Sequence, residues 1–209
     1  MGGRKARIAA AAVLFGTIMP AMLPMQESGA AYAQARRRDD ISGWVRESAS
    51  SALRDKDENV RVDAAWRLRY GVEDGADISP AVAALADALS DSNQNVRGYS
   101  AFALAMQHLK RKEWPKAAAL LEHKDDEVRA NAGWAVGAAA EKKYALAPFV
   151  QTLEKSLSNG NEYVEWNAGK ALALHYLGKG QKRKAEELLQ KDDEDVRQGA
   201  EEAFRLFRK

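Results

Sequence analysis

The chain has 209 residues, 32 of them Lys or Arg and 30 Asp or Glu, and it contains no cysteine. The length allows one or two domains with a buried core, and the missing cysteine excludes disulfides, thiolate catalysis and Cys-ligated zinc or iron–sulfur sites. Ala, Leu, Glu, Lys and Arg dominate the composition and only 5 prolines occur, which predicts an all-α protein.

The first 33 residues have the pattern of a signal peptide. Three basic residues precede an apolar run over residues 8–25, and Ala31-Tyr32-Ala33 places small side chains where a signal peptidase requires them. We therefore expect cleavage after Ala33 and a secreted or periplasmic protein. A charged linker, residues 34–40, follows this signal peptide.

Other interpretations of the N-terminus stay open. Cleavage after Ala35 also fits the small residues, and an organellar presequence shares the same segment features. An uncleaved membrane anchor is disfavoured by Pro20 and Pro24, and because the apolar run is at the lower limit of length for a membrane span.

The expected mature chain is electrically neutral. Removal of residues 1–33 takes away three basic residues and one acid, Glu27, which leaves 29 basic and 29 acidic residues. A neutral chain has no overall field that favours nucleic acid or an anionic membrane surface. We therefore expect no nucleic-acid partner, and contact with a membrane only if the N-terminal segment stays attached.

A phrase made of a polar, mostly acidic turn, a valine, usually an arginine, and then small residues recurs five times. Successive valines are separated by 36, 32, 36 and 32 residues; they are Val60, Val96, Val128, Val164 and Val196. The alternation predicts a unit of two helical hairpins, 68 residues long, that has been duplicated. At this offset Pro80 aligns with Pro148 and Trp66 with Trp134.

Each phrase predicts the second helix of a hairpin. In four of the five phrases apolar or small residues follow the valine at four, seven and eight positions, which is one helical face, and the polar residues before the valine fit an N-cap and first turn. The first helices of the hairpins are expected between the phrases, at residues 41–53, 80–89, 114–121, 148–157 and 181–189.

This pattern resembles the HEAT-repeat family, in particular the short bacterial repeats that also occur in phycobilin lyases. The acidic turn, the Val-Arg pair and the Ala-rich helix carry the resemblance, which covers residues 41–209. It implies a right-handed α-solenoid of about five helical hairpins. Their expected bounds are residues 41–71, 79–111, 114–142, 144–178 and 180–209.

The resemblance also implies a ladder of charged contacts between neighbouring repeats. In the family the arginine after the valine pairs with a turn acid, which assigns the ladder here to Arg61, Arg97, Arg129 and Arg197. Glu165 interrupts this series, so we expect the solenoid to bend or loosen at the fourth repeat, unless Glu165 finds a basic partner. Glu201 stands where earlier repeats carry a small residue and predicts a polar C-terminal cap.

Large aromatic residues recur six positions after the valine, away from the core face, as Trp66, Phe102 and Trp134. Tyr99 and Trp166 lie at nearby helical angles. Together these residues predict an aromatic patch on the concave surface, where such side chains bind partner proteins. The alternative, that they pack on neighbouring helices, stays open.

No residue pattern predicts a catalytic, metal or cofactor site. His108, His123 and His175 are scattered over three repeats without ligand spacing, and we expect them at the surface or at helix ends. No pair of carboxylates stands in an apolar segment, as acid–base catalysis would require. The basic stretch 178–184 lacks the glycine spacing of a phosphate loop and is expected to be a solvated turn.

We therefore expect a non-catalytic, exported scaffold or adaptor, a monomer without a cofactor, that binds another protein through its concave face. Two alternatives stay open. One is a bilin lyase or chromophore chaperone, which the phycobilin-lyase resemblance implies. The other is a structural spacer anchored in a membrane by an uncleaved N-terminus.

Overall fold

The computed structural model describes residues 38–208. The expected signal peptide, its cleavage sites and most of the charged linker lie outside these residues. The chain divides into two units, residues 1–40 and 41–209, and the second contains the repeats. No helix in the described part of the chain is long and apolar enough to cross a membrane.

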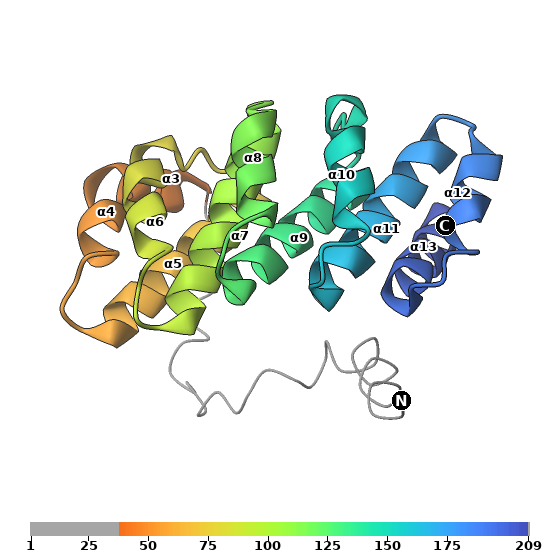
Figure 1. Ribbon diagram of the computed structural model, residues 1–209. Coiled ribbons are helices and arrows are strands. Elements are labelled where there is room, and N and C mark those ends of the chain that lie inside the picture. The colour runs from red at the N-terminus through yellow and green to blue at the C-terminus, as the bar shows by residue number, and fades with distance from the viewer. Residues whose placement is uncertain (1–37, 209) are drawn as a thin grey trace. The chain divides into compact units, whose positions relative to one another are not determined.

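The described chain is helical from end to end, as expected, and residues 38–208 contain no strand (Figure 1). In order, the elements are α3 (Arg38–Glu47), α4 (Ala49–Ala52), α5 (Glu58–Glu73), η1 (Ser79–Ala81), α6 (Val82–Ala88), α7 (Gln94–Lys110), α8 (Trp114–Leu121), α9 (Asp126–Glu141), η2 (Ala147–Phe149), α10 (Val150–Ser156), α11 (Glu162–Gly178), α12 (Lys182–Leu188) and α13 (Glu194–Phe207).

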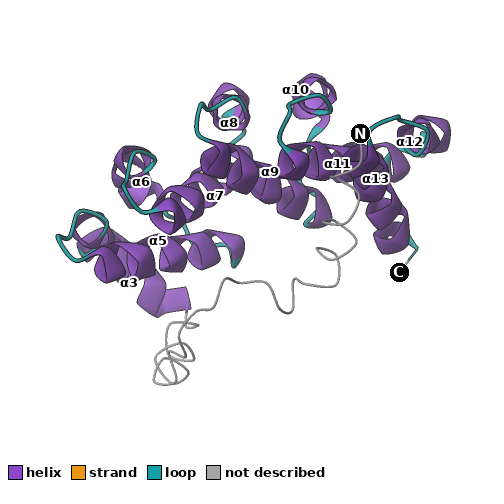
Figure 2. Cartoon of the chain, turned by 60° about the horizontal axis from the view of Figure 1, so that its bottom comes forward, coloured by secondary structure: helices purple, strands orange, loops and turns teal. Residues whose placement is uncertain are grey.

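Long and short helices alternate and form two layers. The long helices α5, α7, α9, α11 and α13 form a row in which each one packs against the one before it in the chain, from α7 onward. The short helices α6, α8, α10 and α12 lie together on one side of that row (Figure 2). The opposite side of the row is therefore formed by the long helices alone, and we call it the inner face.

The five valine phrases begin the five long helices, as predicted, and the polar residue three positions before each valine is the N-cap. Its side-chain oxygen accepts from backbone N–H groups of the first turn, which have no partner within the helix. The five caps are Asp57, Asn93, Asp125, Asn161 and Asp193.

The helix bounds repeat at the predicted offset of 68 residues. Helix α5 spans residues 58–73 and α9 spans 126–141, while α7 spans 94–110 and α11 spans 162–178. The pair η1–α6 covers residues 79–88 and η2–α10 covers 147–156. Because whole elements coincide at this offset, the structure supports a duplicated pair of hairpins.

The first helix departs from its predicted bounds of 41–53. It is broken at Ser48, between α3 and α4. Helical hydrogen bonds continue through Ser48, whose N–H donates to the carbonyl oxygen of Trp44 at 2.8 Å and whose carbonyl oxygen accepts from the N–H of Ala52 at 2.9 Å and from the Ser51 hydroxyl at 2.9 Å. The other first helices form within two residues of where they were expected.

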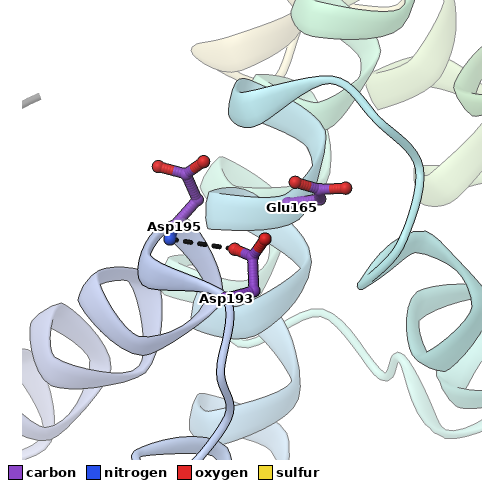
Figure 3. Close-up of side chains that lie close together, drawn as sticks. All are labelled: Glu165, Asp193 and Asp195. Carbon is purple, nitrogen blue, oxygen red and sulfur yellow. Dashed lines mark hydrogen bonds between the residues drawn. The ribbon is translucent and has the colours of Figure 1, made fainter. Parts of the chain in front are cut away.

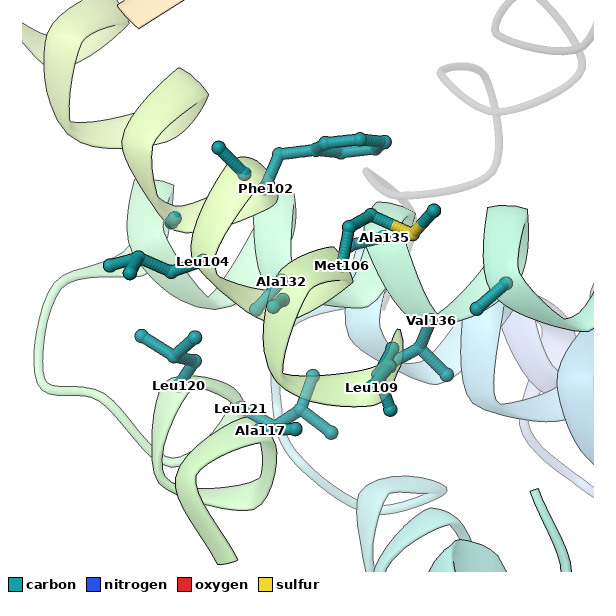
Figure 4. Close-up of a cluster of buried hydrophobic side chains, with 14 of the residues drawn as sticks. Phe102, Leu104, Met106, Leu109, Ala117, Leu120, Leu121, Ala132, Ala135 and Val136 are labelled. Atoms are coloured by element: carbon teal, nitrogen blue, oxygen red, sulfur yellow. The ribbon is translucent and has the colours of Figure 1, made fainter. Parts of the chain in front are cut away.

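The core lies between the two layers and is built from Ala, Leu and Val side chains. Leu104 and Leu109 of α7, Leu120 and Leu121 of α8, and Val136 of α9 are almost fully buried together (Figure 4). A single-residue insertion would rotate such a face out of the core, so the 3.6-residue periodicity of the sequence is a direct record of this packing.

Glycines let the long helices α11 and α13 approach until their backbones touch. A Cβ atom on Gly199 would overlap the carbonyl oxygen of Trp166 and lie 2.9 Å from its carbonyl carbon. A Cβ on Gly169 would lie 2.6 Å from the carbonyl oxygen of Val196. Neither neighbour is a side chain that can rotate away, so glycine is needed at both positions.

We predict that Gly199→Ala lowers the free energy of unfolding by about 2 kcal/mol, because α11 and α13 must separate to admit the methyl group. Gly178→Ala is the matched control, since nothing lies within 4 Å of its Cβ position. That change should leave stability unchanged or raise it by up to about 1 kcal/mol. Urea unfolding followed by circular dichroism measures both, and equal stability of the two variants would contradict the prediction.

Candidate functional site

The arginine that follows the valine has the same local role in four repeats. Its Nη1 atom donates to two backbone carbonyls five and six residues earlier, in the turn that joins the two helices of the hairpin. Arg61, for example, reaches the carbonyl of Asp55 at 2.9 Å. The same pair of bonds is made by Arg97, Arg129 and Arg197.

Two of these arginines also form an ion pair with the next repeat. Arg61 contacts Asp91 through Nε at 2.7 Å and Nη2 at 3.1 Å, and this hydrogen bonding raises the pKa of Arg61. Arg97 Nε lies 3.0 Å from Asp125 Oδ2. Arg129 instead pairs with Asp126 of its own helix, and Arg197 makes no ion pair among the described residues. The ladder therefore joins only the first three repeats.

In the fourth repeat Glu165 stands in place of the arginine and accepts a hydrogen bond from the turn instead of donating to it. Its Oε1 accepts from the backbone N–H of Gly160 at 2.7 Å, so the turn is held by a backbone donor where the arginines use backbone acceptors. Within the described part of the chain Glu165 forms no ion pair, so the hypothesis of a basic partner is wrong. Only 8% of Glu165 is exposed, and this burial raises its pKa, with Asp193 adding to the shift and the Gly160 bond opposing it.

Glu165 faces Asp193 and Asp195 at the start of α13 (Figure 3). One carboxylate oxygen from each residue lies within 4.8 Å of the others. Burial raises the pKa of Asp195 to about 6, helped by the charges of Asp193, Glu162 and Glu165, and its Oδ1 is buried without a hydrogen-bond partner. We call Glu165, Asp193 and Asp195 the acidic cluster.

The acidic cluster is the one group within residues 38–208 whose oxygen atoms are close enough to hold a metal ion, and hard cations such as Ca²⁺ and Mg²⁺ prefer such ligands. Asp193 is already engaged as the N-cap of α13. The sequence pattern did not predict the cluster, because Glu165 is far from Asp193 along the chain. Two features of the sequence could have indicated the cluster. Glu165 stands where the other repeats carry the ladder arginine, and the N-cap of the next long helix, Asp193, is also an acid.

We predict that the acidic cluster makes the free energy of unfolding fall as the pH rises from about 4 to about 7. The folded chain keeps a proton on Asp195 up to about pH 6, whereas the unfolded chain loses it near the ordinary pKa of 3.8, so the folded state binds more protons in this window. Asp195→Asn should remove a decrease of about 1 kcal/mol, a value reduced for partial solvent exposure.

The measurement is urea unfolding of wild type and Asp195→Asn across this pH range. Asp192→Asn is the control, because Asp192 is exposed in the same turn and outside the acidic cluster. It should keep the wild-type slope. An unchanged slope in Asp195→Asn would show that the cluster is not the origin of the pH dependence.

The predicted aromatic stripe is only partly exposed. Phe102 lies on the side of α7 away from α8, as expected for the inner face (Figure 4). However, Phe102 is 2% and Tyr99 9% exposed, so the prediction that these two side chains offer binding surface is wrong. Trp66, Trp134 and Trp166 are half-buried and keep part of their rings accessible. The accessible aromatic surface therefore lies on α5, α9 and α11, with a gap at α7.

The tryptophans pack on aromatic neighbours, as the packing alternative expected, and partner binding through their accessible parts stays a prediction. The rings of Trp66 and Tyr70 have centroids 4.6 Å apart within α5. The ring of Trp134 lies 5.3 Å from that of Trp166 and 6.2 Å from that of Tyr163, both on α11. Such contacts hold the rings in fixed orientations.

Two basic residues, missed in the sequence analysis, are inserted between these rings. Arg69 of α5 places Cζ 4.6 Å from the ring centroid of Phe102 and 5.5 Å from that of Tyr99. Lys170 of α11 places Nζ 4.4 Å from the Trp166 ring and 5.8 Å from the Trp134 ring. Cations over aromatic faces are favourable, more so when they are desolvated. Arg69 in particular covers the ring of Phe102.

The three histidines and the basic stretch 178–184 do not join the acidic cluster. His108 is buried in the last turn of α7 against Glu113, with Nδ1 2.6 Å from Oε2, so it lies at a helix end, one of the two expected places, and not at the surface. His123 and His175 are partly buried, in other repeats. Residues 178–184 form an exposed turn and helix start, as expected.

Residues 115–205 match a family model described as HEAT repeats. Among solved structures, the crystal structure of an engineered protein from the Northeast Structural Genomics Consortium has a TM-score of 0.47 at 21% identity, covering 85% of this chain and 91% of that chain. No curated protein matches the chain in sequence. The family match covers the third, fourth and fifth valine phrases and confirms the resemblance inferred from them.

Proposed function

We propose that this chain, a HEAT-repeat protein by the match over residues 115–205, is an exported, non-catalytic scaffold that binds another protein on its inner face. Helical repeats of this kind stack into extended surfaces suited to protein partners. The proposed form is a monomeric, right-handed solenoid of five hairpins, with its signal peptide cleaved after Ala33.

The observation that carries the proposal is the set of half-buried tryptophans on the inner face. Trp66, Trp134 and Trp166 come from α5, α9 and α11, and their rings are fixed by neighbouring aromatic side chains. Large aromatic side chains with few rotatable bonds lose little entropy when a partner covers them, so they are frequent centres of binding energy. Three of them on a rigid row of helices favour an extended partner.

We predict that alanine at Trp66, Trp134 and Trp166 together abolishes capture of the partner from the native host while helicity is retained. The control replaces Lys182, Arg183 and Lys184 of the outer helix α12 by alanine, because these three side chains are exposed and far from the inner face. Mass spectrometry of captured proteins compares the variants with wild type. A partner that binds the tryptophan variant as well as wild type would contradict the proposal.

Export is tested separately. Expression of the full chain in a bacterium should yield a protein outside the cytoplasm whose intact mass corresponds to a start at Gln34, since Ala31-Tyr32-Ala33 fits a signal-peptidase site. Retention of residues 1–33 in a membrane fraction would replace the scaffold proposal by that of an anchored protein.

A further inference from the structure

The two cation–aromatic sites of the inner face occupy equivalent places in the duplicated halves of the chain. The first lies between α5 and α7 and contains Arg69, and the second lies between α9 and α11 and contains Lys170. At the offset of 68 residues Arg69 corresponds to Gly137, and Phe102 corresponds to Lys170. The cation therefore comes from the first long helix in one half and from the second in the other.

In the second site the positive charge is paired with an acid of the chain. Lys170 Nζ lies 2.6 Å from Glu141 Oε1, and only 4% of the Lys170 side chain is exposed. A Cβ atom on Gly137 would lie 2.9 Å from Lys170 Cε and 3.0 Å from Nζ, so the lysine fills the space above this glycine. The ammonium group thus has an anionic partner within the chain.

Among residues 41–208, whose side chains the structure describes, the first site has no such anion. Arg69 makes no ion pair and no hydrogen bond with any of them, and its Nε is buried without an acceptor. Glu73, the equivalent of Glu141, forms no ion pair there. The two Nη atoms are not buried, and aromatic rings of Tyr70, Tyr99 and Phe102 surround the guanidinium.

A partly desolvated guanidinium with unused donors is an unsatisfied group, and its planar fork fits a carboxylate with two parallel hydrogen bonds. The neighbouring rings offer apolar contact, and the partial burial of the guanidinium strengthens such a bond. Nucleic acid is disfavoured as the ligand, because phosphate backbones are bound by several cations at once and the expected mature chain is neutral.

We propose that Arg69 receives the side-chain carboxylate of an Asp or Glu in the partner protein, and that apolar residues flanking this acid contact the rings of Trp66 and Tyr70. The partner segment is therefore apolar with an acidic residue at its centre. This inference rests on the proposed function, because it assigns the chemistry of the segment that the inner face binds.

The test is selection of randomised peptides on the full-length chain, with every peptide acetylated and amidated so that no terminal charge remains. Each selected peptide is then synthesised with its Asp or Glu and with the matching Asn or Gln. We expect wild type to bind the acid form about 10- to 100-fold more tightly than the amide form. Arg69→Met should abolish this difference.

Arg183→Met is the matched control, because Arg183 is an exposed arginine on the outer helix α12 with 91% of its side chain accessible. It should keep the wild-type preference for the acid form. Circular dichroism shows whether Arg69→Met is folded, and if it is not, Arg69→Gln, which retains a polar side chain, gives the same readout.

Equal binding of acid and amide forms to wild type, or a preference that survives Arg69→Met, would overturn the inference. If such peptides still lose binding when the three tryptophans become alanine, the proposed function stands and only the role of Arg69 falls. If no peptide binds wild type better than the tryptophan variant, both fail. Preferential binding of anionic lipid vesicles through Arg69, without peptide discrimination, would also overturn the inference.

Discussion

Every feature of the inner face depends on how closely the long helices approach one another. At Gly133, Gly169 and Gly199 an added Cβ would meet the backbone of a neighbouring long helix, and at the position equivalent to Gly133 the first two repeats carry the fully buried Ala65 and Ala101. Each hairpin buries on its neighbour a face that it cannot bury alone. Because the chain has no cysteine, this packing and the polar contacts of the turns hold the array together.

The turns show how one structural task can be met with opposite charges. In four repeats an arginine donates to the carbonyls of its own turn, and in the fourth repeat Glu165 accepts from the N–H of Gly160. The backbone is tied down in each case. What changes is the relation to the next repeat, since Arg61 attracts Asp91, whereas Glu165 faces the like charges of Asp193 and Asp195.

Duplication preserved the helix bounds while the side chains of the inner face diverged. Both halves place a cation against aromatic rings between two long helices, yet Lys170 pairs with Glu141, whereas Arg69 pairs with no acid in the described part of the chain. A closed ion pair contributes to folding alone, whereas a guanidinium with unused donors is available to a ligand. By our inference, the N-terminal half of the inner face adds a carboxylate-binding group to the aromatic surface that both halves supply.

The sequence by itself determined the helical class, the five N-caps, the 68-residue duplication and the HEAT-repeat resemblance, because these follow from local hydrogen bonding and from periodicities that any one helix must satisfy. It also placed Trp66 and Trp134 on one face. It did not reveal that Phe102 and Tyr99 are covered by Arg69, nor that Glu165 meets Asp195, because both contacts join helices whose side chains are brought together only by packing. Exposure and charge pairing depend on every neighbour in space, and so the tertiary structure alone decided them.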